Sequence, residues 1–163
     1  MSLADMRIVF VGGAFDLLHI GHVRFLQAAK EEGDVLIVCV ATDEVRSQRP
    51  GKGTPIIPFE QRFEMIATLE CVDIVLPYEG PKDYTAVEKY GANVRVVSDQ
   101  FEYPFHKGVR QELEKRGVEY VTVPHTPEVS TTLIKGRVKE LYREDDSDTD
   151  DDPTSTANRM RPA

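Results

Sequence analysis

Residues 7–22 read RIVFVGGAFDLLHIGH, and this stretch decides the fold. The β-branched and aromatic run Arg7–Val11 predicts a buried strand, because it ends abruptly at the turn-forming pair Gly12-Gly13. Apolar residues then recur at helical spacing over Ile20–Glu32, and Gly33 predicts the end of that helix. A strand that passes through a glycine turn into a helix is the first unit of an alternating α/β fold.

The same alternation continues along the chain. Short apolar runs predict four more strands, amphipathic stretches predict the helices between them, and the Pro- and Gly-rich residues 46–58 predict a long loop. The pattern predicts a doubly wound, Rossmann-like α/β fold, in which a five-stranded parallel sheet carries helices on both faces. The further strands are expected at 34–42, 73–77, 94–97 and 119–123, and the further helices at 59–71, 84–90, 106–116 and 130–142.

The charge of the 163-residue chain is unevenly distributed. Acidic residues outnumber basic ones by 28 to 20, and seven of the acidic residues lie in residues 144–163. We therefore expect a folded domain over residues 1–143, followed by an acidic, disordered tail over residues 144–163. The net charge of −8 disfavours nonspecific binding to nucleic acid or to an anionic membrane.

Cysteine and hydropathy patterns indicate an intracellular type of protein. Cys39 and Cys71 are 32 positions apart in apolar surroundings and form no CxxC pair, so we expect free thiols rather than a disulfide or zinc site. No apolar run is long enough for a membrane span, and the N-terminus lacks the pattern of a signal peptide. The expected location is cytoplasmic.

The segment after the first strand carries groups that suit an anion. Paired glycines let the backbone approach a ligand closely, and the free N–H groups at the helix start favour a negative charge. His19 and His22 are three residues apart, so their rings can lie on one side of the helix, and Gly21 leaves room for a phosphate between them. The pattern predicts hydrogen-bond donors that could stabilise a phosphate as it gains charge in a transition state.

Basic residues follow the second strand. Arg46, Arg49 and Lys52 lie in the predicted loop, and Arg62 follows in the next predicted helix. Open parallel sheets bind their ligands at the carboxyl ends of the strands, so these four cations are expected near the same edge of the sheet. Together they fit the charge of a triphosphate.

Polar residues follow the fourth and fifth strands. The run Ser98-Asp99-Gln100-Phe101 comes after the fourth strand, and His125 comes after the fifth. Ser130, Thr131 and Thr132 then open the last predicted helix, where hydroxyl and N–H groups could bind a second phosphate or simply cap the helix.

Two motifs in this order, GAFDLLHIGH at residues 13–22 and VSTTLI at residues 129–134, resemble the cytidylyltransferase-type nucleotidyltransferases. That superfamily includes glycerol-3-phosphate cytidylyltransferase, the choline- and ethanolamine-phosphate cytidylyltransferases, heptose-phosphate adenylyltransferases and phosphopantetheine adenylyltransferase. The resemblance spans roughly residues 7–142. PFEQR at residues 58–62 and VDIV at residues 72–75 make the chain most similar in appearance to the alcohol-phosphate cytidylyltransferases.

The resemblance implies an activity for the predicted nucleotidyltransferase domain. It implies transfer of CMP from CTP to a phosphorylated alcohol such as glycerol 3-phosphate, with release of pyrophosphate. It further implies catalysis by His19, His22 and Lys52, Mg²⁺ as cofactor with Asp16 as a candidate ligand, and a homodimer. The residues expected to bind the nucleotide are Gly12, Gly13, Ala14, Phe15, Gly21, Arg62, Ser130, Thr131 and Thr132, and those expected to bind the acceptor are Asp99, Phe101 and Arg49.

Several residues depart from the pattern of the superfamily. Ala14 replaces a threonine, Ser98 a glycine, His125 an arginine and Glu128 a glycine. These changes leave the base of the nucleotide and the identity of the acceptor open, because they alter charge and hydrogen bonding close to the expected triphosphate. Glycerol, ethanolamine or choline phosphate, a sugar phosphate and a phosphonate all stay candidates for the acceptor.

Three alternatives follow from the same residues. An adenylyltransferase that uses ATP and a sugar phosphate fits GTPIIP at residues 53–58, although its usual KGxD segment is missing at residues 96–99. A nucleotide-binding module without catalytic activity fits the departures, but binding alone would not need both His19 and His22. HIGH is also a signature of class I aminoacyl-tRNA synthetases, which the short, acidic chain does not otherwise resemble.

Overall fold

The computed structural model describes residues 5–48, 53–100 and 107–147. Its five strands form one sheet in the order β3-β2-β1-β4-β5, and every neighbouring pair is parallel. The predicted fold class is confirmed, because the chain alternates between apolar strands and amphipathic helices throughout. The strands are β1 (Ile8–Gly13), β2 (Val35–Ala41), β3 (Ile74–Tyr78), β4 (Val94–Ser98) and β5 (Glu119–Val123).

Helices connect the strands and one follows the last strand. The helix predicted over residues 59–71 ends at Ala67, where the Thr68 hydroxyl donates to the Met65 carbonyl oxygen over 2.7 Å. The last helix runs to Ser147, because no glycine or proline interrupts it where the tail was predicted to begin. The helices are α1 (Ile20–Glu31), α2 (Asp43–Ser47), α3 (Phe59–Ala67), α4 (Thr85–Tyr90), α5 (Lys107–Lys115) and α6 (Thr131–Ser147).

A short helix, α2, lies where the sequence predicted only a loop. Its N-cap residue Thr42 accepts a hydrogen bond from the backbone N–H of Val45 through Oγ1, over 3.4 Å. A five-residue helix carries too few residues for a periodic pattern, so only the threonine cap and the acidic first turn could have indicated it.

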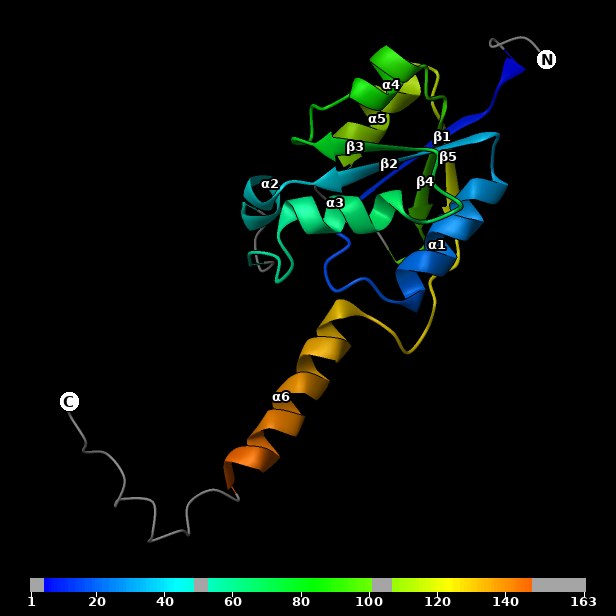
Figure 1. Ribbon diagram of the computed structural model, residues 1–163. Helices are drawn as coiled ribbons and strands as arrows, with labels where there is room; N and C mark the ends of the chain where they lie inside the picture. The colour runs from blue at the N-terminus through cyan, green and yellow to red at the C-terminus, as the bar shows by residue number, and fades with distance from the viewer. Residues whose placement is uncertain (1–4, 49–52, 101–106, 148–163) are drawn as a thin grey trace, which may run out of the picture. The chain divides into compact units, whose positions relative to one another are not determined.

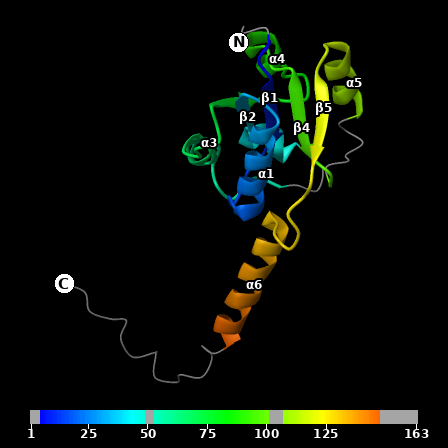
Figure 2. The ribbon, with the colours of Figure 1, turned by 90° about the vertical axis from the view of Figure 1, so that its right-hand side faces the viewer.

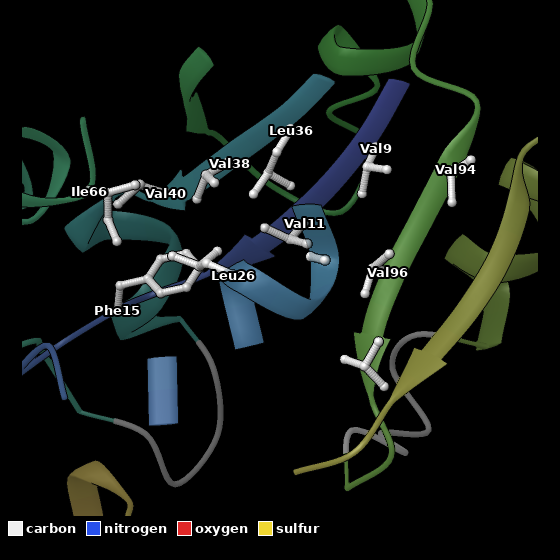
Figure 3. Close-up of a cluster of buried hydrophobic side chains, with 12 residues drawn as sticks. Val9, Val11, Phe15, Leu26, Leu36, Val38, Val40, Ile66, Val94 and Val96 are labelled. Atoms are coloured by element: carbon white, nitrogen blue, oxygen red, sulfur yellow. The ribbon is translucent and has the colours of Figure 1, made fainter. Parts of the chain in front are cut away.

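Two hydrophobic clusters cover the two faces of the sheet. One cluster contains Val94 and Val96 of β4 together with side chains of α1 and α3, and its residues are drawn in Figure 3. The other cluster contains Phe10 of β1 together with side chains of α4 and α5. Figure 1 shows α4 and α5 on one side of the sheet and α1 and α3 on the other, and Figure 2 shows α3 and α5 on opposite sides of the strands. The sheet is therefore doubly wound.

Contacts divide the chain into two compact units, Met1–Val129 and Ser130–Ala163. The first unit holds the sheet and helices α1 to α5, and the second holds α6. Both cysteines are free thiols, Cys39 buried and Cys71 partly buried. Within the described residues, no helix has the length and the apolar character that crossing a membrane requires.

Candidate active site

Strand β1 ends at the point where the order of the strands reverses. It pairs with β2 on one side and with β4 on the other, and the chain leaves it through residues 14–19 to enter α1. A doubly wound sheet opens a crevice at this point, beyond the carboxyl ends of its strands. The predicted histidine motif therefore occupies the place where the fold binds ligands.

The two motif histidines are brought together at the start of α1. His19 is the N-cap residue, and its ring stacks on that of His22 with 3.8 Å between the centroids and 19° between the planes. The Nδ1 atom of His22 accepts a hydrogen bond from the backbone N–H of His19 over 3.4 Å. Since Nδ1 accepts, the neutral His22 ring carries its proton on Nε2, where it can be donated to a ligand.

Burial keeps both rings uncharged. It lowers the pKa of His22 to about 4, helped by the neighbouring His19 and opposed by the negative charge of Asp16. The pKa of His19 is also lowered, first by burial and then by the positive charge that His125 can carry. At neutral pH the pair therefore offers neutral hydrogen-bond donors rather than cations.

One nitrogen of the histidine pair lacks a protein partner. The Nδ1 atom of His19 is buried and makes no hydrogen bond within the residues that the structure describes. A buried polar atom without a partner is uncommon, because leaving it unsatisfied costs free energy. The atom is shielded from solvent, so the His19 ring can reach a ligand only through its other nitrogen, Nε2.

Gly21 allows the backbone to pass between two side chains. A Cβ atom added to it would lie 2.9 Å from Cγ1 of Val129 and 3.0 Å from Cε1 and Nδ1 of His19. Any larger residue would therefore push the His19 ring out of its position. The glycine is thus needed for the packing of His19 and Val129, and not to leave room for a phosphate between the histidines as predicted, because the two rings stack directly on each other.

The loop between β1 and α1 has an unusual backbone. Phe15 and Leu17 have φ angles of +52° and +49°, a region that non-glycine residues rarely adopt. The ring of Phe15 is buried in the core and meets the His22 ring edge-on, with 5.5 Å between centroids. A Cβ atom on Gly13 would lie 3.0 Å from the Phe15 ring. Phe15, predicted to bind nucleotide, thus packs its side chain inward and supports His22.

Arg62 is fully buried beneath the loop rather than exposed at the edge of the sheet. Its Nη1 group donates to the carbonyl oxygens of Ala14 and Ala41, the latter over 2.9 Å. Its Nε group donates to the Ile57 carbonyl oxygen over 2.8 Å, and Nη2 pairs with the Asp43 carboxylate at 2.5 Å. Four of its five N–H groups thus bind the protein and tie β1, β2, α2 and residue 57 together.

Asp16 links the same parts of the chain. Its Oδ1 atom accepts hydrogen bonds from the backbone N–H groups of Ile56 and Ile57, both over 3.0 Å, and the residue is only 5% exposed. No cluster of three His, Cys, Asp or Glu side chains suited to a metal ion lies in the described part of the chain. The metal-binding role predicted for Asp16 stays a prediction.

The ends of β4 and β5 are joined by Asp99. Its backbone N–H donates to the Val123 carbonyl oxygen, and its Oδ1 atom accepts from the backbone N–H of His125, both over 3.0 Å. His125 in turn influences the pKa of His19, so the end of β5 lies near the histidine pair. His125, which the sequence analysis placed after the fifth strand, is thus close to the histidine pair.

The remaining predicted site residues stay predictions. In the second unit, Ser130 Oγ accepts from the backbone N–H of Leu133 over 3.2 Å, which confirms the N-cap but leaves a nucleotide contact by Ser130, Thr131 and Thr132 untested. Arg49, Lys52 and Phe101 lie outside the described residues.

Residues 10–137 match the profile of the family described as Cytidylyltransferase-like, which covers most of the chain. The chain belongs to the cytidylyltransferase-like family. This family and the relatives of the chain all belong to the nucleotidyltransferase superfamily. The resemblance predicted from the two motifs is therefore confirmed.

The chain is similar to two kinds of relative, which differ from each other in length. The chain is 37% identical over 144 residues to an FAD synthase of Thermococcus kodakarensis, covering 83% of the chain and 94% of that relative. It is 46% identical over 133 residues to the bifunctional protein HldE of Nitratiruptor sp., covering 82% of the chain. The chain spans only 28% of the length of that HldE protein, so the match concerns one part of it.

A solved structure supports the same family fold. The crystal structure of a lipopolysaccharide core biosynthesis protein from Thermoplasma volcanium superposes with a TM-score of 0.60 and 25% sequence identity. The match covers 74% of this chain and 97% of that protein.

Proposed function

We propose that this member of the cytidylyltransferase-like family transfers AMP from ATP to the phosphate of a small phosphorylated molecule and releases pyrophosphate. A phosphate oxygen of the acceptor attacks the α-phosphorus, a new P–O–P link forms, and the bond between the α- and β-phosphates breaks. The electron pair of the broken bond leaves with pyrophosphate. No covalent enzyme intermediate is needed, so catalysis depends on positioning and on stabilisation of charge.

The observation that carries the proposal is the stacked pair of neutral imidazoles at the start of α1. His22 directs its Nε2–H away from the backbone, and His19, whose Nδ1 atom is buried, has its Nε2 atom for a ligand. Negative charge on the α-phosphate oxygens grows in the transition state, where preorganised donors stabilise it most. The free N–H groups of the first turn of α1 add to the stabilisation of this negative charge.

The choice of ATP over CTP differs from the first interpretation of the motifs. FAD, the product named for the Thermococcus relative, contains an AMP group joined by a P–O–P link to the phosphate of a phosphorylated flavin. An enzyme that makes it by this chemistry needs ATP and an acceptor that carries a phosphate. The relatives therefore favour the adenylyltransferase alternative over transfer of CMP to glycerol 3-phosphate.

Further parts of the proposal follow from the sequence. Mg²⁺ would be held mainly by the phosphate oxygens of the nucleotide, as is common for this ion, because Asp16 Oδ1 already accepts two backbone hydrogen bonds. The ion would neutralise phosphate charge. Lys52 would bridge the attacking and α-phosphates, Ser130 and Thr131 would hold the leaving phosphates, and the protein would act as a homodimer.

A panel of donors and acceptors tests the proposal. The protein is incubated with Mg²⁺, with ATP or CTP, and with FMN, hexose and heptose 1-phosphates, or glycerol 3-phosphate, and release of pyrophosphate is measured. We expect turnover with ATP and one phosphorylated acceptor. Turnover with CTP alone would return the assignment to a cytidylyltransferase. Binding of nucleotide without turnover on any acceptor would favour the non-catalytic module.

Matched variants connect the turnover to the site. His19→Ala and His22→Ala remove the donors, and Gln27→Ala alters an exposed side chain on the same helix. We expect the histidine variants to lose at least about a hundredfold in kcat, the usual effect of removing such a donor, while Gln27→Ala behaves as the unchanged protein. Equal activity in all three variants would remove the histidines from the mechanism.

A further inference from the structure

The side chain of Arg95 reaches from the middle of β4 to the end of β1. In the sheet register Arg95 lies opposite Phe10, but its guanidinium group lies beside Gly12, two residues closer to the carboxyl end. A Cβ atom on Gly12 would be 3.2 Å from Nη2 and 3.3 Å from Nη1 of Arg95. The arginine therefore extends along the strand towards the point where the strand order reverses.

Neutral groups surround this guanidinium. It lies over the Phe10 ring, 4.9 Å from the centroid, and Tyr120 is its neighbour on β5. Burial raises the pKa of Tyr120, and it raises the pKa of the nearby Cys39 to about 11, so both stay uncharged at neutral pH. The surroundings thus hold the arginine in place without cancelling its charge.

No carboxylate of the described residues forms an ion pair with Arg95. Asp83 is near Cys39, but its oxygens accept hydrogen bonds from the backbone N–H groups of Glu79 and Thr85. By contrast, Arg110 on the same face of the sheet pairs with Glu114 at 2.8 Å. A half-buried cation without a counter-ion can bind an anion from outside the protein.

Arg95 and the histidine pair flank β1 from opposite faces of the sheet. Val94 and Val96 pack with α1 and α3, so the alternation of the strand directs Arg95 to the face of α4 and α5. In an in-line displacement, the attacking oxygen approaches the α-phosphorus on the side opposite the leaving pyrophosphate. The histidines would contact the α-phosphate, so a separate cation on the other face of β1 is available for the phosphate of the acceptor.

We propose that Arg95 binds the phosphate of the acceptor and holds its oxygen for attack on the nucleotide. This inference rests on the proposed function and adds a residue to it. Gly12 is required at the end of β1 because a side chain there would occupy the space of the guanidinium. The proposal also gives two arginines different roles. Arg62 is buried and bonded to backbone carbonyl oxygens, whereas Arg95 would bind the substrate.

Nuclear magnetic resonance tests the inference without requiring turnover. The Nε–Hε signals of the arginines are followed during titration with FMN and with inorganic phosphate, and the signal of Arg95 is assigned from Arg95→Lys. We expect a saturable shift of the Arg95 signal, while that of Arg110 stays unchanged. No shift with either probe would overturn the inference. A shift of equal size with ATP alone would also overturn it, because Arg95 would then contact the nucleotide.

Kinetics with the active acceptor provide the second test. Arg95→Gln should raise the KM for the acceptor by about tenfold or more, the loss of one charged hydrogen bond, and leave the KM for ATP unchanged. Arg95→Lys should restore part of the affinity, and Arg110→Gln serves as the control on the same face. An unchanged acceptor KM in Arg95→Gln would overturn the inference while leaving the proposed function intact. Absence of turnover in the unchanged protein would instead count against the proposed function.

Discussion

Replacing Gly21 with alanine should impair catalysis far more than folding. The added methyl group would lie 2.9 Å from Val129 Cγ1 and 3.0 Å from two atoms of the His19 ring. Ordinary carbon contacts are near 3.5 Å or longer, so the ring must move by about half an ångström. Such a displacement separates the imidazole from the position that the proposed mechanism requires.

The expected effects on stability and activity can be estimated separately. Alanine gains up to about 1 kcal/mol over glycine in a helix, whereas overpacking costs about 1–3 kcal/mol, so the net loss of stability should stay within about 2 kcal/mol. A misplacement of about 1 Å can lower a rate about a hundredfold, so we expect kcat to fall by about 10- to 100-fold. Catalysis should thus be lost in a protein that is still folded.

Gly108→Ala is the matched control. Gly108 is also the second residue of its helix, α5, and among the described residues no atom outside the helix's own backbone lies within 4 Å of the position of an added Cβ. Pyrophosphate release gives kcat, and urea unfolding gives the free energy of unfolding. If Gly21→Ala keeps kcat within twofold of Gly108→Ala, the argument that Gly21 positions His19 is refuted.

Three other perturbations have expected outcomes. The pKa of His22 falls from 6.5 to about 4 on folding, so the unfolded chain binds a proton more readily than the folded one. The free energy of unfolding should therefore decline as the pH is lowered from about 6.5 to 4, by at most about 3 kcal/mol. Urea unfolding should show a flatter decline for His22→Gln, which has no titrating group at this position. Arg62→Met should lower the free energy of unfolding by about 3–5 kcal/mol, because it leaves three carbonyl groups and the partly exposed Asp43 carboxylate without their donor, whereas the exposed Arg24→Met should change it little. Gly33→Ala would bring a Cβ atom to 2.5 Å from the Arg7 carbonyl oxygen; calorimetry should show a loss of about 1–3 kcal/mol, and kcat of the folded fraction should stay unchanged.

The fold could be predicted because each strand is a short apolar run that leads into an amphipathic helix. Alternation of this kind leaves few topologies, and Gly33 marked the end of α1. Gly12 and Gly13, predicted as a turn after the first strand, are instead its last two residues and pair with β2. Helix α2 could not be predicted in this way, since its five residues carry no periodic signal. The end of α6 was misplaced because acidic composition indicates a solvated surface as readily as disorder.

The site was predictable where spacing alone determines proximity. His19, Gly21 and His22 lie within one turn at a helix start, so their sequence separation fixes their neighbourhood. The internal bonds of Arg62 and the reach of Arg95 depend on carbonyl groups and rings from other elements that meet only in the folded chain. A motif cannot distinguish a buried arginine from one that faces a ligand.

Labelled nucleotide tests the central claim most directly. The protein is given ATP labelled at the α-phosphate or at the γ-phosphate, together with Mg²⁺ and the acceptor that releases pyrophosphate. The account predicts that the α-label appears in the product with the acceptor, that the γ-label appears in pyrophosphate, and that His22→Ala suppresses both. Transfer of the γ-label to the acceptor, or undiminished transfer in His22→Ala, would contradict it.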